Sequence, residues 1–262
     1  RNRHATLPNQ ADLLIKAVAP DGSLLGTTGR YTTVESPLVR VRPITGLVGR
    51  LTNLSVRGQL ESNGEPLIAG FVTSGSATSN TLARAIGPGL APFGVDDAAQ
   101  DPQLTLFRNG MAVATNDDWD ASLATRFAAL GAFALAPLSR DAALETSVGE
   151  GNYTAVVTAA NVGRGTVLAE LYQPADAPRR FINVSARSTV DVNRPLIAGF
   201  TISGEVPIRV LVRASGPALA GSPFNLPGTL PDPQLTLYRG STALWENRDW
   251  DALRITDPGE VL

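Results

Sequence analysis

Hydrophobic and polar residues alternate along much of the chain in short runs that are typical of β-strands. The runs fall between Ser55 and Gln173 at spacings of about ten residues, and each is bounded by Gly, Pro, Asn or Asp. Such spacing is found in β-sandwiches and jelly rolls. The pattern therefore predicts an all-β fold with strands at SVRGQL, LIAGFVTSG, TLARAIG, QLTLFRNG, MAVATN, NYTAVVTAA and TVLAELYQ.

Two stretches carry other signals. Asn109-Gly110, in FRNGMAV, suits a two-residue type I′ turn and predicts a hairpin. Between Ala121 and Leu135, alanine and leucine recur at helical spacing, which predicts one short helix or helical turn.

The sequence contains an internal repeat, which sets the expected architecture. Matching segments are offset by 129 to 131 residues, and both copies reach the same acidic motif. After that motif, the first copy continues to Tyr172, whereas the second has only LRITDPGEVL. The matches pair Leu51–Gly58 with Phe181–Ser188, Pro66–Gly75 with Pro195–Gly204, Leu82–Ala91 with Leu211–Ala220, and Asp101–Gly110 with Asp232–Ser241.

The repeat predicts two tandem β-sandwich, jelly-roll-like domains, the second of them incomplete. Residues 49–173 form the first, with the short helix; 174–180, which are proline-rich, form a linker; and 181–262 form the truncated second. Residues 1–48 are an N-terminal extension or the end of a preceding domain. Because the chain begins and ends abruptly, we expect it to be a piece of something longer.

An incomplete sandwich leaves strand edges that need cover. Another chain can supply it, as in donor-strand complementation; otherwise the missing part was cut away or lies outside this sequence. Residues 1–48 are a candidate donor, because YTTVESPLVRVRP precedes LTNLSVRG as YTAVV and VLAELYQP precede FINVSAR.

Composition excludes several functional classes. The 22 basic and 24 acidic residues give a net charge of -2, which fits neither a nucleic-acid surface nor a polybasic membrane anchor. The lack of cysteine excludes disulfides and thiolate chemistry, and no apolar run is long enough for a membrane span.

Few residues suit catalysis, and we predict that the protein is not an enzyme. His4 is the only histidine and lies in a predicted tail, which disfavours catalytic triads and histidine metal sites. Gly87–Gly94, GPGLAPFG, is too rich in proline for a phosphate loop and indicates a turn-rich crossover. A glycosidase carboxylate pair is disfavoured because Asp117 is replaced by Arg248 in the second copy.

The motif NDDWDA recurs as NRDWDA, and its alternate polar residues are kept. This spacing aims oxygen ligands at one point and predicts a candidate calcium site, although the other features of an EF-hand are missing. The alternative is structural, with the Asn and Asp side chains capping the turn and the following helix. The residues are Asn116, Asp118 and Asp120, and Asn247, Asp249 and Asp251.

Two further residue types recur in both copies and are candidate ligand-binding residues. Trp119 and Trp250 are either packing anchors or platforms for sugar rings. Arg84 and Arg213 either form an internal ion pair or hydrogen bond, with the acidic turn as one partner, or clamp a ligand carboxylate.

DPQLTLFRNGMAVATNDDWDA followed by GEGNYTAVVTAANVGRGTVLAELYQ resembles a repeat of very large secreted bacterial proteins. The resemblance covers Leu51–Tyr172 and part of Phe181–Asp251. More distantly, the segment is similar to the bacterial pre-peptidase C-terminal domain, a β-sandwich, with Glu150 in place of that pattern's proline. The resemblance implies a secreted, non-catalytic accessory or surface module, with calcium as a candidate stabilising ion.

These observations lead to two functional hypotheses. The first is an extracellular structural or adhesive protein whose tandem repeats assemble head to tail into a fibre, with other copies of itself or neighbouring repeats as partners. The alternative is a carbohydrate-binding accessory module of a secreted hydrolase, with polysaccharide as the partner. For both hypotheses we expect either no cofactor or Ca²⁺ at the acidic turn.

Overall fold

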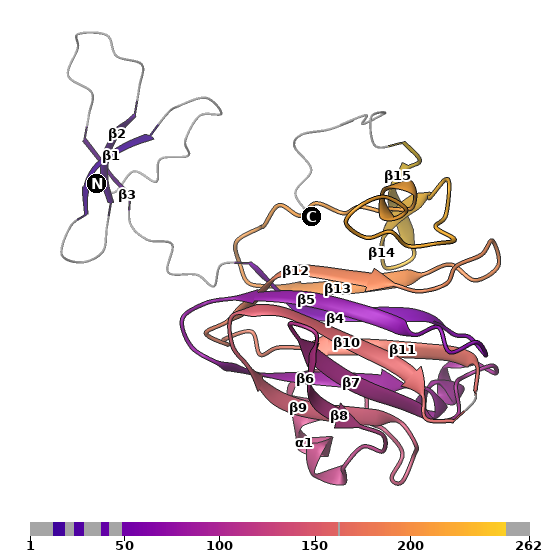
Figure 1. The fold of residues 1–262 in the computed structure, drawn as a ribbon. Coiled ribbons are helices and arrows are strands. Elements are labelled where there is room, and N and C mark those ends of the chain that lie inside the picture. Colours follow the sequence, from indigo (N-terminus) through magenta and orange to yellow (C-terminus); the bar gives the residue numbers. More distant parts are fainter. Residues whose placement is uncertain (1–12, 19–23, 29–37, 42–48, 162, 250–262) are drawn as a thin grey trace. The chain divides into compact units, whose positions relative to one another are not determined.

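The computed structural model describes residues 13–18, 24–28, 38–41, 49–161 and 163–249 (Figure 1). The chain forms two compact units, Arg1–Val48 and Gly49–Leu262. The first unit contains an antiparallel three-stranded sheet in the order β1-β2-β3. Its strands are β1 (Leu13–Val18), β2 (Leu24–Thr28) and β3 (Leu38–Val41).

The second unit is built almost entirely of antiparallel strands, with one short α-helix, which confirms the all-β prediction. Its strands are β4 (Arg50–Leu60), β5 (Leu67–Ser74), β6 (Ser79–Ile86), β7 (Pro102–Arg108), β8 (Met111–Asn116), β9 (Ala142–Val148), β10 (Gly151–Ala159), β11 (Gly165–Tyr172), β12 (Arg180–Arg187), β13 (Ile197–Ser203), β14 (Leu235–Arg239) and β15 (Thr242–Asn247). The helical segments are η1 (Pro88–Phe93), η2 (Ala121–Leu123), α1 (Ala124–Ala129) and η3 (Pro217–Leu219).

The predicted local turns are present, with one difference in length. Asn109 and Gly110 have φ values of 51° and 79°, the backbone that a type I′ turn requires, and join β7 to β8. The predicted helix is shorter than its sequence pattern, because α1 ends at Ala129 and Gly131 adopts a left-handed φ of 71°. The chain from Ala132 onward therefore packs as a loop.

Ten strands form one sheet in the order β8-β7-β10-β5-β12-β4-β11-β6-β9, with β13 paired beside β4. The sheet curls until its ends approach, and the Ala143 amide donates a 2.8 Å hydrogen bond to Asn116 Oδ1 between the β9 and β8 ends. The result is a nearly closed, barrel-like sheet. Its interior holds alternate side chains of the strands, including Phe71, Leu106 and Val157.

The strands β6 and β11 are buried on both faces. One face contributes to the barrel interior, and the other lies under α1 and its flanking loops, where Leu82, Ile86, Phe127 and Leu135 form a second cluster. Burial in both strands is therefore nearly continuous rather than alternating.

β12 and β13 come from the second copy of the repeat but lie in the sheet of the first (Figure 1). β12 pairs with β5, with Val184 opposite Phe71, and β13 pairs with β4, with Phe200 opposite Leu54. Separate tandem sandwiches are therefore not confirmed. The predicted linker is also packed, since Ala177 and Arg179 are buried and Arg50 donates hydrogen bonds to their carbonyl oxygens.

The two inter-copy pairings are the same pairing with the copies exchanged. The repeat matches β4 to β12 at an offset of 130 and β5 to β13 at an offset of 129. Under this exchange, each β12–β5 residue pair becomes a β13–β4 pair, and the irregularity at Ile182 becomes the one at Thr52. The copies thus associate by a local two-fold relation, the self-complementary geometry of an isologous interface.

This register predicts a disulfide between engineered cysteines. A Cβ placed at Gly70 would lie 3.9 Å from the Cβ of Ser185, within the range of about 3.5–4.5 Å found in disulfides. Because the natural chain has no cysteine, Gly70→Cys/Ser185→Cys should lose both free thiols on mild oxidation without forming covalent dimers. Thiol titration and mass measurement check this.

The matched control is Gly70→Cys/Ser203→Cys, because Ser203 lies opposite Arg50 on β4 and should keep its thiol. Free thiols in the first variant after oxidation would show that β12 does not pair with β5 in this register.

Candidate functional site

Arg84 and Glu170 form an ion pair inside the second unit. They lie opposite each other on β6 and β11, and their exposed fractions are 0% and 5%. The guanidinium donates from Nε and Nη2 to Glu170 Oε2 at 2.9 and 2.5 Å, and from Nη1 to the Phe133 carbonyl at 2.7 Å. Arg84 therefore has the internal ion pair that was one of its two predicted roles, with Glu170 rather than the acidic turn as its partner.

Aromatic rings enclose this ion pair. The Arg84 guanidinium lies 4.7 Å from the ring centre of Phe127 and 4.5 Å from that of Phe133, within cation–π distance. The Tyr172 hydroxyl donates a 2.9 Å bond to Glu170 Oε1. Burial and the neighbouring Glu170 charge raise the pKa of Tyr172, so this hydroxyl stays protonated as a donor.

Asp141 connects the GPG turn to the acidic turn, a role that the sequence analysis missed. Its side chain is fully buried, and Oδ1 accepts bonds from the amides of Gly87 and Gly89 at 2.8 and 3.1 Å. Oδ2 accepts from the Ser139 hydroxyl at 2.7 Å. A Cβ at Gly89 would lie 3.0 Å from Oδ2, so the carboxylate packs closely against this turn. The sequence signal for this role was the position of Asp141, an acidic residue directly before the apolar run AAL.

Two side chains of the acidic turn bond to the backbone of the same turn and of the residues that follow it. Asn116 Nδ2 donates to the Asp118 carbonyl at 2.9 Å, and Asp120 Oδ1 accepts from the Ser122 amide at 2.8 Å at the start of η2. Hydrogen bonding to the side chain and the amide of Ser122 lowers the pKa of Asp120. Partial burial and the charges of Asp101 and Asp118 raise the pKa of Asp117. The capping role predicted as the alternative to calcium binding is therefore present.

The second acidic turn repeats part of this arrangement. Asn247 Nδ2 donates to the Asp249 carbonyl at 3.0 Å, the counterpart of the Asn116 bond. Trp250 and Asp251 lie outside the described residues. Among the residues that are described, no group of three or more His, Cys, Asp or Glu side chains is arranged to hold a metal ion.

Trp119 is half-buried beside the ion-pair cluster. Its ring centre lies 5.4 Å from that of Phe127, its Nε1 donates to Ser139 Oγ at 3.1 Å, and its amide donates to the Asp141 carbonyl at 2.8 Å. One side of the ring lines an apolar hollow of about 160 Å³ with Phe127, Leu135 and small residues. Trp119 and Arg84 therefore both lie against the ring of Phe127. Arg213, by contrast, is exposed.

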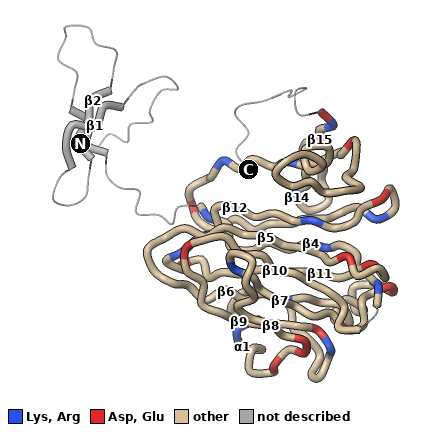
Figure 2. Tube along the Cα trace, in the orientation of Figure 1, with Lys and Arg blue, Asp and Glu red and all other residues tan. Residues whose placement is uncertain are grey.

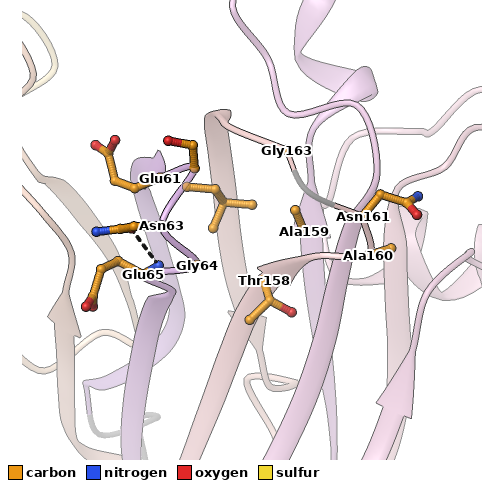
Figure 3. Close-up of a pocket in the computed structure, with 11 residues that line it drawn as sticks. Glu61, Asn63, Gly64, Glu65, Thr158, Ala159, Ala160, Asn161 and Gly163 are labelled. Atoms are coloured by element: carbon orange, nitrogen blue, oxygen red, sulfur yellow. Dashed lines mark hydrogen bonds between the residues drawn. The ribbon is translucent and has the colours of Figure 1, made fainter.

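A larger hollow of about 590 Å³ lies between the β4–β5 and β10–β11 turns (Figure 3). Glu61, Asn63 and Glu65 line one side, and Ala159, Ala160 and Asn161 line the other. Glu61 forms a 3.0 Å ion pair with Arg194, and Asn63 Oδ1 accepts from the Glu65 amide at 3.1 Å. Its lining residues include no aromatic ring on which a sugar would stack.

Charged residues of both signs are interspersed along the second unit (Figure 2). Among the described residues, no helix has the length and hydrophobicity needed to cross a membrane. Comparisons of the chain with protein-family models, curated proteins and solved structures found no match.

The buried ion pair predicts a strongly asymmetric mutational response. Arg84→Ala should lower the free energy of unfolding by roughly 3–5 kcal/mol, because it leaves Glu170 buried without a partner. The double variant Arg84→Met/Glu170→Leu should lose less than the single variant, since no uncompensated charge remains. Urea denaturation measures both changes.

The control is the partly exposed pair of Arg126 and Glu145, which are joined at 2.6 Å. Arg126→Ala should cost no more than about 1 kcal/mol. A double variant less stable than Arg84→Ala would contradict the assignment of Glu170 as the partner.

Proposed function

We propose that this chain is a non-catalytic structural or adhesive protein of the bacterial cell surface, built from tandem β-sandwich repeats that join through their strand edges. The observation that carries the proposal is the local two-fold pairing of β4 with β13 and of β5 with β12. Each copy presents the same two edges, so the surface that joins one repeat to the next is part of the repeat itself. This two-fold contact is closed, because each copy uses its two edges on the other, so further copies have to add through the remaining edges of the second copy.

The chemistry of the candidate site supports a structural role. Arg84, Glu170 and Asp141 are buried and make hydrogen bonds within the chain. Such networks fix the positions of strands and loops relative to one another. The extracellular location rests on the resemblance to repeats of large secreted bacterial proteins.

The assembly that we propose is head to tail, through the edges of the second copy. Among the described residues, β13 pairs only with β4 and β14 pairs only with β15, so each has one edge without a described partner. Unpaired edges recruit strands from other chains. Residues 1–48 of a neighbouring chain are the donor that the sequence analysis favours.

The full chain should therefore self-associate. We expect its mass by multi-angle light scattering to rise with concentration, and negative-stain microscopy to show linear particles rather than compact ones. A strictly monomeric chain across the concentration range would refute head-to-tail assembly.

The acidic turn gives a separate test of calcium dependence. Because Asn116 and Asp120 already cap the turn, we expect calcium or a chelator to leave the melting temperature unchanged. A rise in melting temperature with calcium that Asp118→Ala removes would instead establish the turn as a calcium site.

The alternative function is carbohydrate binding, and the half-buried Trp119 beside its apolar hollow favours it. Retention on polysaccharide that Trp119→Ala abolishes, with an unchanged melting temperature, would support this function over the structural one.

A further inference from the structure

The connection between the two copies is short and is tied to the first copy by two arginines. Residues 173–179 join β11 to β12. Arg179 is only 6% exposed, and its amide donates to Ser79 Oγ at 3.2 Å. Arg50, at the start of β4, donates to the carbonyl oxygens of Ala177 and Arg179. These contacts hold the connection against the first copy.

The Arg179 guanidinium is buried without a partner for its charge. In the part of the chain that the structure describes, its Nε and Nη1 have no hydrogen-bond partner, and neither has the Nε of Arg50. Burial and the positive charge of Arg180 lower the pKa of Arg50. A buried cation with unpaired N–H groups is costly. The closed connection therefore contains an unfavourable interaction, which exposure of Arg179 to water would remove.

The contact that this connection closes can also form between two chains. β12 pairs with β5 and β13 pairs with β4, and each pairing involves one strand of each copy. When fully extended, residues 173–179 would span about 23–25 Å, enough to pass from one chain to a neighbour. Such an exchange is domain swapping, which short hinge segments under strain favour.

We infer that second copies exchange between chains, so that β12 and β13 of one chain pair with β5 and β4 of another. Residues 173–179 are the hinge, and the release of Arg179 into water is the favourable change. The exchange moves an existing contact and adds none, and it leaves the remaining edges of β13 and β14 to residues 1–48. This inference deepens the proposed function and rests on its self-association.

The second copy of another chain fits these edges better than its first copy does. The ring of Phe181 packs edge to face against Phe71, with 5.4 Å between the ring centres. Leu51 is the counterpart of Phe181 in the first copy, so pairing between two first copies would lose this aromatic contact. Within one chain the short connection gives a high effective concentration, so exchange requires a concentrated solution.

The test detects exchange by disulfide formation between different chains. Full chains with Gly70→Cys are mixed with full chains with Ser185→Cys, kept concentrated and then oxidised mildly. Exchange brings these positions together, because a Cβ at Gly70 would lie 3.9 Å from the Cβ of Ser185. We expect covalent dimers on non-reducing electrophoresis. While dimers are the minority, their ratio to monomer should rise about tenfold for a tenfold rise in concentration.

The role of Arg179 is tested in the same mixture. Arg179→Met in both chains removes the unpartnered charge from the closed form and should lower the dimer yield about tenfold or more. Arg187→Met is the matched control, because Arg187 is an exposed arginine on β12, and it should leave the yield unchanged. Every mixture contains Gly70→Cys, so the effect of that substitution cancels.

A mismatched mixture sets the background. Ser203 lies opposite Arg50, so chains with Ser203→Cys should not link to chains with Gly70→Cys. A yield no higher than this background, or a yield that Arg179→Met does not reduce, would overturn the inference. Disulfides between Gly70→Cys chains and Ser55→Cys chains would also overturn it, because they would show that first copies pair with each other.

The inference and the proposed function can fail separately. Linear particles of the natural chain without mixed disulfides in the cysteine mixture would overturn the exchange and support head-to-tail assembly. Mixed disulfides in closed dimers, without linear particles, would support the exchange and refute head-to-tail assembly.

Discussion

The described structure of the second unit depends on backbone pairing between the two copies of the repeat. Within the first copy, β4 is paired on one side by β11, and β5 is paired on one side by β10. Unpaired strand edges are costly and prone to association. β13 and β12 fill those two positions, and the sheet becomes continuous from β8 to β9. The pairing between the copies therefore covers the free edges of both β4 and β5.

The two-fold relation explains why a tandem repeat supplies its own partner. Equivalent residues of the two copies make equivalent contacts. Ser185 lies opposite Gly70, and Ser55 lies opposite Gly199. On the outer face, the Arg84–Glu170 pair fixes β6 against β11 and holds the aromatic rings near α1. The copies pair through β4 and β5, whereas the buried ion pair joins β6 and β11. The pairing of β4 with β11 connects the two interactions.

Local features were predictable from the sequence, and long-range ones were not. Alternation located β5, β7 and β10 because each has one buried face, and Asn109-Gly110 indicated the hairpin that joins β7 to β8. β9 was missed because AALETSV does not alternate. The partner of Arg84 was not predictable, because Glu170 lies 86 residues away and meets it only through the register of β6 and β11.

The expectation of separate sandwiches was not confirmed, for a related reason. A sequence repeat indicates which segments are alike. It does not show whether the strands of one copy pair only with each other or also with strands of the other copy. The self-capping of the acidic turn was one of two predicted alternatives, since Asn and Asp oxygens suit both backbone amides and a cation. The geometry around Asn116 and Asp120 shows which bonds form.

Native-state amide hydrogen exchange of the full chain tests the pairing of the copies most directly. The account predicts that amides of β12 and β13 are protected as strongly as those of β10, while residues 207–215, which share their copy but have no strand neighbours, exchange rapidly. Exchange in β12 and β13 as rapid as in residues 207–215 would contradict it.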